Sequence, residues 1–449
     1  MIAREVRQNT RDAWRTDVNG WIRLHTEGDP FRLGFQNGYL LAAEIRDLFG
    51  RVRAYARHTW EDWGFFRETA RSLYQEKLAP EYREEIEGIW AGLTAHGVSE
   101  FDLLDLIALN GYFDTSSYYY WQRAEQARRR GQRLPPAEEH GGCSAFLATG
   151  AWTRNGGLVV AHNTWVAYMV AGWRVLLDIV PSSGHRVFMQ CWPGTIHSGT
   201  DFYLSDAGLV VTETTITGAV TMRPEGTPSF IRSRQSIQYA DSLDGWMDGM
   251  RRDNSGSYAN DWMVGDAHTG EIALLELATM HEAVQKTSSG YFVGCNVAQD
   301  PAVRSETLFN YSDATNSCNV RWQRWHDLIA RRAGSIDVAF AKEAIADHLD
   351  LRTGTERPSR ATLCGHVDLD AGGLGEWDWG PFYPGGAIDG IVTDSALAAG
   401  GRLWAHWGKP CGIPVQGRAH LEAHPEYQWQ QPWVRDLDPY PWTLFEAGW

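Results

Sequence analysis

The sequence changes character at a glycine pair followed by a cysteine, Gly141-Gly142-Cys143, and this change limits the folds open to the chain. From Trp21 to about Tyr120, apolar residues recur at helical spacing among many charged ones. Beyond the cysteine, short apolar runs alternate with turn residues, which is typical of strands. The chain therefore predicts a mainly helical first part and a strand-rich second part.

Several apolar runs after Cys143 are expected to form strands, some of them buried on both faces. They are 158–161, 173–180, 187–191, 208–216, 261–264, 272–277 and 291–295. Helical spacing returns at 320–332 and 336–348. From about residue 350 the chain is rich in Gly, Pro and Trp, which predicts irregular structure.

Segment 123–142 separates the two parts. It is charged, contains a Pro pair and ends in a Gly pair, and this composition predicts that the segment is a linker. We therefore expect a helical N-terminal segment, 1–122, then this linker, then a catalytic part, 143–449. With 449 residues the chain can bury a large core.

The formal net charge of -15 would repel a polyanion, so we expect no nucleic-acid partner. No segment reaches the roughly 18 uncharged apolar residues that span a bilayer, so no membrane span is predicted. Residues 1–21 lack the apolar stretch of a secretory signal, and we expect a cytoplasmic protein. The sequence leaves a homo-oligomer open.

The six cysteines are widely scattered and form no CxxC pair, which argues against a zinc knuckle and against a disulfide framework. Their default interpretation is as small buried residues. The 15 histidines show no HExxH motif and no paired His/Asp spacing, so we predict no metal site and no cofactor. The run His366-Val367-Asp368-Leu369-Asp370 could bind a cation weakly.

Cys143 stands where a chain that cuts itself would carry its nucleophile. A preceding glycine lets the backbone bend, so that the thiol can reach the carbonyl of Gly142. Cleavage between Gly142 and Cys143 would free an α-amino group whose pKa near about 8 suits a base at neutral pH. A lone cysteine is more often structural, so the pattern needs support from the rest of the chain.

That support comes from runs that follow Cys143 in order. They are Cys143-Ser144-Ala145, His162-Asn163-Thr164-Trp165, Asp201-Phe202-Tyr203 with 208–215, and 254–263. Over about residues 141–330 these runs resemble the phospholipase B-like family, which is related to the acid ceramidase, choloylglycine hydrolase and isopenicillin acyltransferase-like groups. The resemblance implies an α+β fold, the four-layer αββα sandwich of the N-terminal-nucleophile (Ntn) hydrolases.

The resemblance also implies roles for particular residues. Cys143 is the nucleophile and forms a thioester. His162 polarises the thiol or holds the α-amino group, unless it is only a hydrogen-bonded strand residue. Asn260 donates to the oxyanion, unless it is an Asx-turn residue. Glu213, if buried, has a raised pKa and relays a proton.

Four further residues are expected to contact substrate. Asn163, Thr164 and Trp165 share the strand of His162. Arg304 faces substrate, or else forms a plain surface ion pair. The tryptophans of the last third either pack beneath loops or wall a substrate cleft.

The resulting expectation is a self-activated cysteine hydrolase that cleaves a linear amide, with no cofactor. Two alternatives use the same thioester, an acyl-ester hydrolase and an acyltransferase. A third is a non-catalytic binding protein that has kept the fold.

Overall fold

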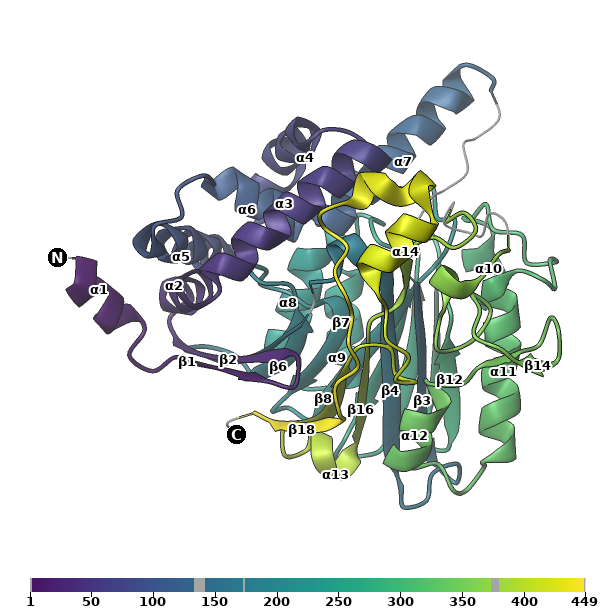
Figure 1. Ribbon diagram of the computed structural model, residues 1–449. Helices are drawn as coiled ribbons and strands as arrows, with labels where there is room; N and C mark the ends of the chain where they lie inside the picture. Colours follow the sequence, from purple (N-terminus) through teal and green to yellow (C-terminus); the bar gives the residue numbers. More distant parts are fainter. Residues whose placement is uncertain (1, 133–141, 173, 373–378, 448) are drawn as a thin grey trace.

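The computed structural model describes residues 2–132, 142–172, 174–372, 379–447 and 449, and it has a mixed α+β fold with two large sheets (Figure 1). The first sheet has nine strands. In spatial order they are β1 (Trp14–Val18), β2 (Trp21–Gly28), β5 (Val175–Pro181), β6 (Val187–Cys191), β7 (Gly199–Ser205), β8 (Leu209–Thr215), β9 (Asn260–Asp266), β10 (Ile272–Leu277) and β11 (Glu282–Thr287). Only the β2–β5 pair is parallel among these.

The second sheet has seven strands, and the first of them along the chain carries Cys143 near its start. In spatial order they are β12 (Gly290–Gly294), β3 (Gly142–Gly150), β4 (Gly156–Ala167), β16 (Asp389–Asp394), β17 (Arg402–Trp407) and β18 (Thr443–Glu446), with β15 (Gly385–Ala387) also paired to β4. A separate small hairpin joins β13 (Leu349–Asp350) and β14 (Thr355–Glu356).

Most of the longer helices precede Cys143. They are α1 (Ile2–Asn9), α2 (Pro30–Leu40), α3 (Ala42–Thr59), α4 (Trp63–Thr69), α5 (Pro80–His96), α6 (Leu103–Asn110) and α7 (Tyr112–Arg129). The later helices are α8 (Ser229–Tyr239), α9 (Leu243–Arg251), α10 (Pro301–Arg304), α11 (Ser317–Arg331), α12 (Val338–Ala344), α13 (Ser395–Ala398) and α14 (Gly417–Ala423). Short 3-10 or π turns lie at Ala70–Tyr74, Gln75–Lys77, Tyr168–Val170, Val367–Leu369 and Pro425–Gln430.

The two sheets pack against each other through β3 of one and β8, β9 and β10 of the other. The approach is close, because a Cβ on Gly265 of β9 would lie 2.8 Å from Leu158 Cδ2 of β4. Helices α8 and α9 contact the nine-stranded sheet, whereas α11 and α12 contact the seven-stranded one (Figure 1). This double cover explains why β3 and β8 are buried almost throughout.

Most strand expectations agree with the structure, and two of them, 187–191 and 272–277, coincide with β6 and β10. The expectation of irregular structure beyond residue 350 is wrong, because β15 to β18 complete the seven-stranded sheet there. β16 is buried along nearly its whole length, so sheet pairing and packing outweigh its Gly-rich surroundings.

The first part of the chain is not purely helical. β1 and β2 form one edge of the nine-stranded sheet, and β2 pairs with β5 from beyond Cys143. The expected linker begins inside α7, which continues to Arg129 and carries an Arg128–Glu125 ion pair at 2.6 Å. Charged residues spaced three apart support a helix as readily as a linker, which explains the difference. Residues 133–141 lie outside the described residues.

The tryptophans of the last third mainly pack. Trp379 and Trp407 are buried, and others pack against the core while partly exposed. Trp377 lies outside the described residues. Across the described ranges, none of the helices combines the length and apolar character that crossing a bilayer requires.

The tightest helix contact in the N-terminal part joins α2 and α5, and glycines permit it. A Cβ on Gly38 would lie 2.1 Å from the Ile89 carbonyl oxygen, and a Cβ on Gly92 would lie 2.3 Å from the Phe35 carbonyl oxygen. Since backbone atoms rather than flexible side chains fill this space, the helices would have to separate to admit a methyl group.

Gly38→Ala is therefore expected to lower the free energy of unfolding by about 2–3 kcal/mol, because overpacking shifts the backbone. Chemical denaturation would measure the change. The control is Gly245→Ala in α9, where the nearest atom to the new Cβ is Ser242 Oγ at 3.3 Å. This control should be neutral or stabilising, and an equal loss in both variants would contradict the close-packing argument.

Candidate functional site

Cys143 is fixed on both sides of its backbone. It is the second residue of β3 and pairs with Thr164 of β4. Its backbone N–H donates to Asn296 Oδ1 at 3.1 Å, and its carbonyl oxygen accepts from Arg321 Nη1 at 2.8 Å. The backbone nitrogen that a cut before Cys143 would release is therefore already held by a side chain.

Asn296 and Arg321 form one clamp around Cys143. Asn296 has a left-handed backbone, with φ of 72°, a conformation that asparagine adopts more readily than most residues. Its Nδ2 donates to the Thr215 carbonyl at 3.0 Å, while its Oδ1 also accepts from Arg321 Nη2 at 3.1 Å. Arg321 is fully buried and stacks 4.2 Å over the ring of Trp165.

Sequence reasoning assigned no role to either residue of this clamp. Asn296 directly follows the expected strand 291–295, so its place at a strand end was the available signal. Arg321 stood in an expected helix with many charges. The sequence signal for Arg321 was its position among the apolar residues of that helix. In the structure it lies on the buried face of α11 beside Val320 and Trp325.

The reactive atoms gather between the two sheets. Cys143, His162 and Glu213, here called the Cys143 group, each offer an Sγ, N or O atom within 4.8 Å of the other two. All three side chains are buried. His162 comes from β4 and Glu213 from β8, so both sheets contribute to the group.

Burial controls protonation in the Cys143 group. It raises the pKa of the Cys143 thiol well above its usual range, and the nearby Glu213 carboxylate raises it further. Burial lowers the pKa of His162 to about 3, so its imidazole is neutral at physiological pH. Neither ring nitrogen of His162 has a hydrogen-bond partner within the described ranges. The thiol thus needs a base before it can attack.

Glu213 links the thiol to two further residues. Its Oε1 accepts from the Tyr258 hydroxyl at 3.2 Å. With its amide nitrogen turned toward Glu213, Asn260 donates to Glu213 Oε2 at 2.8 Å and to the Ala259 carbonyl at 2.9 Å. Both amide protons of Asn260 are then in use, so one of these bonds must be exchanged before Asn260 can donate to an oxyanion.

A second carboxyl group, missed by sequence reasoning, supports β4 from behind. Asp389 of β16 accepts from the Thr164 N–H at 2.9 Å and from Gln190 Nε2 at 2.6 Å. Burial raises its pKa to about 7. An acidic residue inside the apolar run 387–392 was the available signal.

The four residues expected to contact substrate have different surroundings in the structure. Thr164 lies opposite Cys143, and its buried Oγ1 has no hydrogen-bond partner among the described residues. Asn163 is engaged at both ends of its amide, accepting from Ser144 N–H and donating to the carbonyls of Ile345 and Leu363.

Trp165 and Arg304 complete the set. Trp165 is fully buried and donates from Nε1 to Asn163 Oδ1 at 3.1 Å. Arg304 donates to the Ala298 carbonyl at 2.8 Å and stacks 4.6 Å over Tyr311. The described contacts of both residues are therefore structural.

A small hollow adjoins the Cys143 group. Its lining residues include Phe113 and Tyr120 of α7, together with Thr215, Tyr258 and Ala259, and its volume is about 30 Å³. Tyr258 belongs to both the hollow and the Glu213 network. A substrate entering here would pass between α7 and the strand ends.

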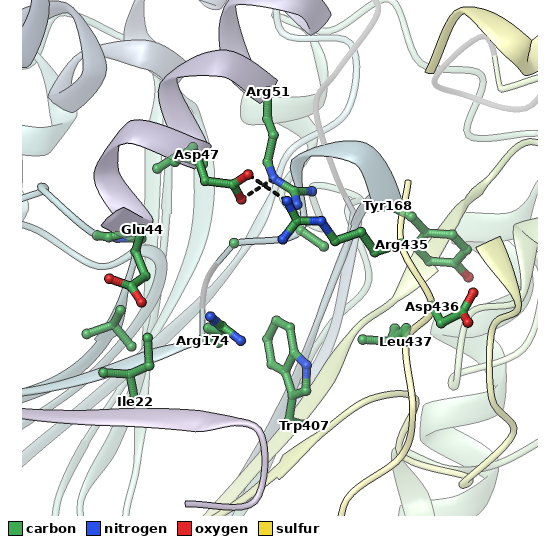
Figure 2. Close-up of a pocket in the computed structure, with 15 residues that line it drawn as sticks. Ile22, Glu44, Asp47, Arg51, Tyr168, Arg174, Trp407, Arg435, Asp436 and Leu437 are labelled. Atoms are coloured by element: carbon green, nitrogen blue, oxygen red, sulfur yellow. Dashed lines mark hydrogen bonds and ion pairs between the residues drawn. The ribbon is translucent and has the colours of Figure 1, made fainter. Parts of the chain in front are cut away.

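A second, charged cavity of about 130 Å³ lies between α3 and the C-terminal segment, as Figure 2 shows. Arg51 and Arg435 both bind Asp47 there, at 2.7 Å each. Arg51 also donates to the carbonyls of Met169 and Trp433. The charged residues of this cavity therefore bind the C-terminal segment to α3.

Comparisons with known proteins concern the part of the chain that carries the Cys143 group. Residues 72–274 match the family model described as Phospholipase B. A phospholipase B-like protein of Rattus norvegicus is 35% identical over 150 residues, covering 29% of this chain and 25% of that protein. An uncharacterized protein of Archaeoglobus fulgidus is 26% identical over 241 residues, covering 50% and 38%.

A third relative, the phospholipase B-like 1 protein of Bos taurus, is 24% identical over 289 residues, covering 54% of this chain and 49% of that protein. The matches thus span about a quarter to a half of the length of these curated relatives. Cys143, His162, Glu213 and Asn260 all fall inside the matched range, whereas Asn296 and Arg321 fall beyond it. The matched region is therefore similar to phospholipase B-like proteins.

The neutral His162 makes stability depend on pH. Its pKa is about 3 in the folded chain against 6.5 ordinarily, so between these values the unfolded chain binds a proton that the folded chain does not. Stability should therefore fall as the pH drops through this window. His162→Gln should reduce that slope by about 1.4 kcal/mol per pH unit.

Urea denaturation at several pH values between these limits would measure the slope, using Cys143→Ala as the background so that the thiol cannot react. The control is His268→Gln at an exposed position, which should keep the parent slope. Equal slopes in the parent and His162→Gln would mean that His162 is protonated in the folded protein.

Proposed function

We propose that this protein is a hydrolase that cuts its own chain between Gly142 and Cys143 and then uses Cys143 as an N-terminal nucleophile. The observation that carries the proposal is the bond from the Cys143 N–H to Asn296 Oδ1 at 3.1 Å. The thiol of the same residue belongs to the Cys143 group. The bond to be cut, the attacking atom and two candidate proton carriers thus belong to one buried site.

Self-cleavage would proceed as an acyl shift followed by hydrolysis. His162 or Glu213 takes the thiol proton, the Cys143 sulfur attacks the Gly142 carbonyl carbon, the C–N bond breaks, and the proton passes on to the leaving nitrogen. Water then hydrolyses the thioester, which releases the Gly142 carboxylate and regenerates the thiol. Asn296 holds the nitrogen throughout, and Arg321 keeps the Cys143 carbonyl in place.

Turnover would use the new α-amino group as the base. It takes the thiol proton, and the sulfur attacks the carbonyl carbon of the substrate. Asn260, once its bond to Glu213 or Ala259 is exchanged, donates to the oxyanion. The tetrahedral intermediate collapses to a thioester and releases the protonated amine, and water then frees the acid.

The layering of the chain supports the Ntn assignment. Two sheets face each other, each has its own helices, and the nucleophile stands near the start of β3, which pairs with a strand on each side. This arrangement is what the four-layer αββα sandwich requires. The N-terminal part would stay attached after the cut, because β2 is hydrogen-bonded to β5 along its length.

An amine base and a thiol serve amides and esters alike, and a linear amide is our first choice of substrate because the proposed self-cleavage already breaks an amide bond at this site. The hollow beside the uncut site has a volume of about 30 Å³, which is too small for an acyl chain, so the proposal also requires that the cut enlarge it. The phospholipase B-like relatives favour an acyl ester as the second candidate. An acyltransferase would pass the same thioester to an amine.

Self-cleavage predicts a two-chain mature protein. Intact-mass spectrometry of wild type should give fragments beginning at Met1 and Cys143, and native gel filtration should keep them together through β2 and β5. Cys143→Ala should remain one chain, and Cys143→Ser should cut more slowly. Efficient cleavage of Cys143→Ala at Gly142 would contradict self-processing, whereas a wild type that is never cut would favour a binding protein.

Asn260→Ala tests the oxyanion role in the cleaved enzyme. It should lower kcat by about 10²–10³ while changing KM much less, because the lost bond forms mainly in the transition state. Asn37→Ala removes a buried amide in α2 and should leave kcat unchanged. A panel of matched amides and esters, with and without an added amine acceptor, would supply the substrates. Unaltered kcat in Asn260→Ala on the best substrate would rule out this role.

A further inference from the structure

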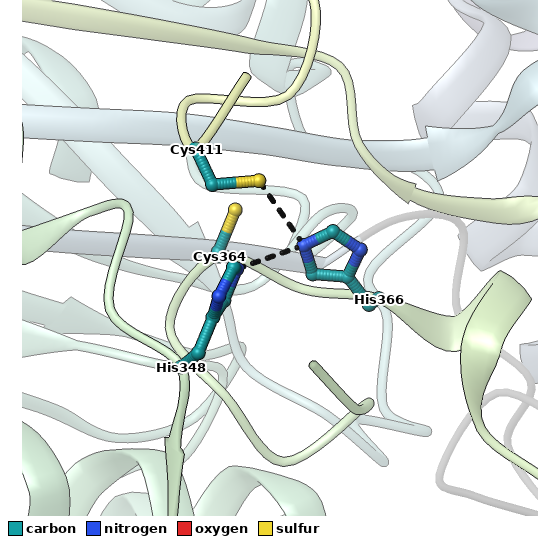
Figure 3. A group of neighbouring side chains, drawn as sticks. All are labelled: His348, Cys364, His366 and Cys411. Carbon is teal, nitrogen blue, oxygen red and sulfur yellow. Dashed lines mark hydrogen bonds between the residues drawn. The ribbon is translucent and has the colours of Figure 1, made fainter. Parts of the chain in front are cut away.

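Four side chains from distant parts of the sequence converge beside β4, in an arrangement that the scattered cysteines did not predict. His348, Cys364, His366 and Cys411, here called the His/Cys cluster, each offer an N or S atom within 4.8 Å of the other three. Figure 3 shows the two imidazoles and the two thiols pointing toward one another. His366 Nε2 lies 3.0 Å from His348 Nε2 and 3.4 Å from Cys411 Sγ.

We propose that the His/Cys cluster binds a single Zn²⁺ ion as a closed, structural site. Two thiolates and two imidazoles are a tetrahedral donor set that selects zinc. With Zn–S of about 2.3 Å and Zn–N of about 2.0 Å, neighbouring donor atoms lie about 3.3–3.8 Å apart. The observed separations of 3.0 and 3.4 Å require only small adjustments to reach that geometry.

The surroundings suit a metal site of this kind. His366 Nδ1, the nitrogen that would not bind the ion, has no hydrogen-bond partner among the described residues, and Asp368 Oδ1 lies 4.0 Å away. A small movement would let this carboxylate orient a metal-bound His366. Lys409 neutralises Asp368 at 3.0 Å and is itself buried. The backbone N–H of Ile413 points to Cys411 Sγ at 3.5 Å. Two thiolates would balance the charge of the ion.

The site would stabilise the wall behind the strand of His162. Leu363, next to Cys364, supplies a carbonyl to Asn163 Nδ2 at 3.0 Å. Gly365 lies so close to Trp165 that a Cβ would be 2.2 Å from its ring. The protein would supply all four ligands and leave no position for a reacting water, so the metal holds the loops in place and takes no part in the chemistry.

Metal content of the tag-free, full-length protein tests the proposal directly. Elemental analysis should find about one zinc per chain in wild type, and Cys411→Ser should lower this about tenfold or more. Cys191→Ser makes the same change at a buried cysteine outside the cluster and should keep the zinc. Cys143→Ala should keep it too, which separates this site from the Cys143 group.

Two measurements on wild type keep the test decisive if a variant fails to fold. Substitution with Co²⁺ should give the thiolate charge-transfer and ligand-field bands of a tetrahedral site. A chelator should lower the Tm of wild type, and zinc should restore it. A reduced wild type that retains no zinc after incubation and gel filtration would overturn the proposal, as would a Cys364–Cys411 disulfide in protein purified under reducing conditions.

Discussion

The hydrogen bonds that hold the backbone of Cys143 are the constraint on which the rest of the site depends. Asn296 binds its N–H and Arg321 binds its carbonyl, and the two side chains also bind each other. Because β3 packs between β4 and β12 and against the second sheet, the thiol can reach only the groups of that interface. The strand thus fixes the direction of attack before any substrate is present.

Placing this site between two sheets has an electrostatic cost. Burial raises the pKa of Asp389 to about 7 and that of Asp261 well above its usual range. Buried carboxyl groups are costly unless they are hydrogen-bonded. Backbone and amide groups donate to Glu213 and Asp389, whereas neither carboxyl oxygen of Asp261 has a partner among the described residues. The same burial keeps His162 neutral and the thiol protonated, so a new base is what would switch the site on.

The C-terminal hundred residues complete the same architecture from the other side. β16 pairs with β4 at His162, and the loop that contains Leu363 binds Asn163. The His/Cys cluster lies in these loops, so a metal there would act on the site only through the position of β4. The proposed catalytic groups and the supporting loops are therefore connected through one strand, β4.

The sequence by itself determined the local elements and the order of the reactive residues. Periodicity is a property of neighbouring residues, so the strands 187–191 and 272–277 and helix α11 were predictable, as was the place of Cys143 at the border of the strand-rich part. Only the tertiary structure decided the roles of Asn296, Arg321 and Asp389. It also decided the C-terminal strands and the His/Cys cluster. Each depends on contacts between residues far apart in the chain, and a pairing across sheets leaves no spacing in the sequence from which to infer it.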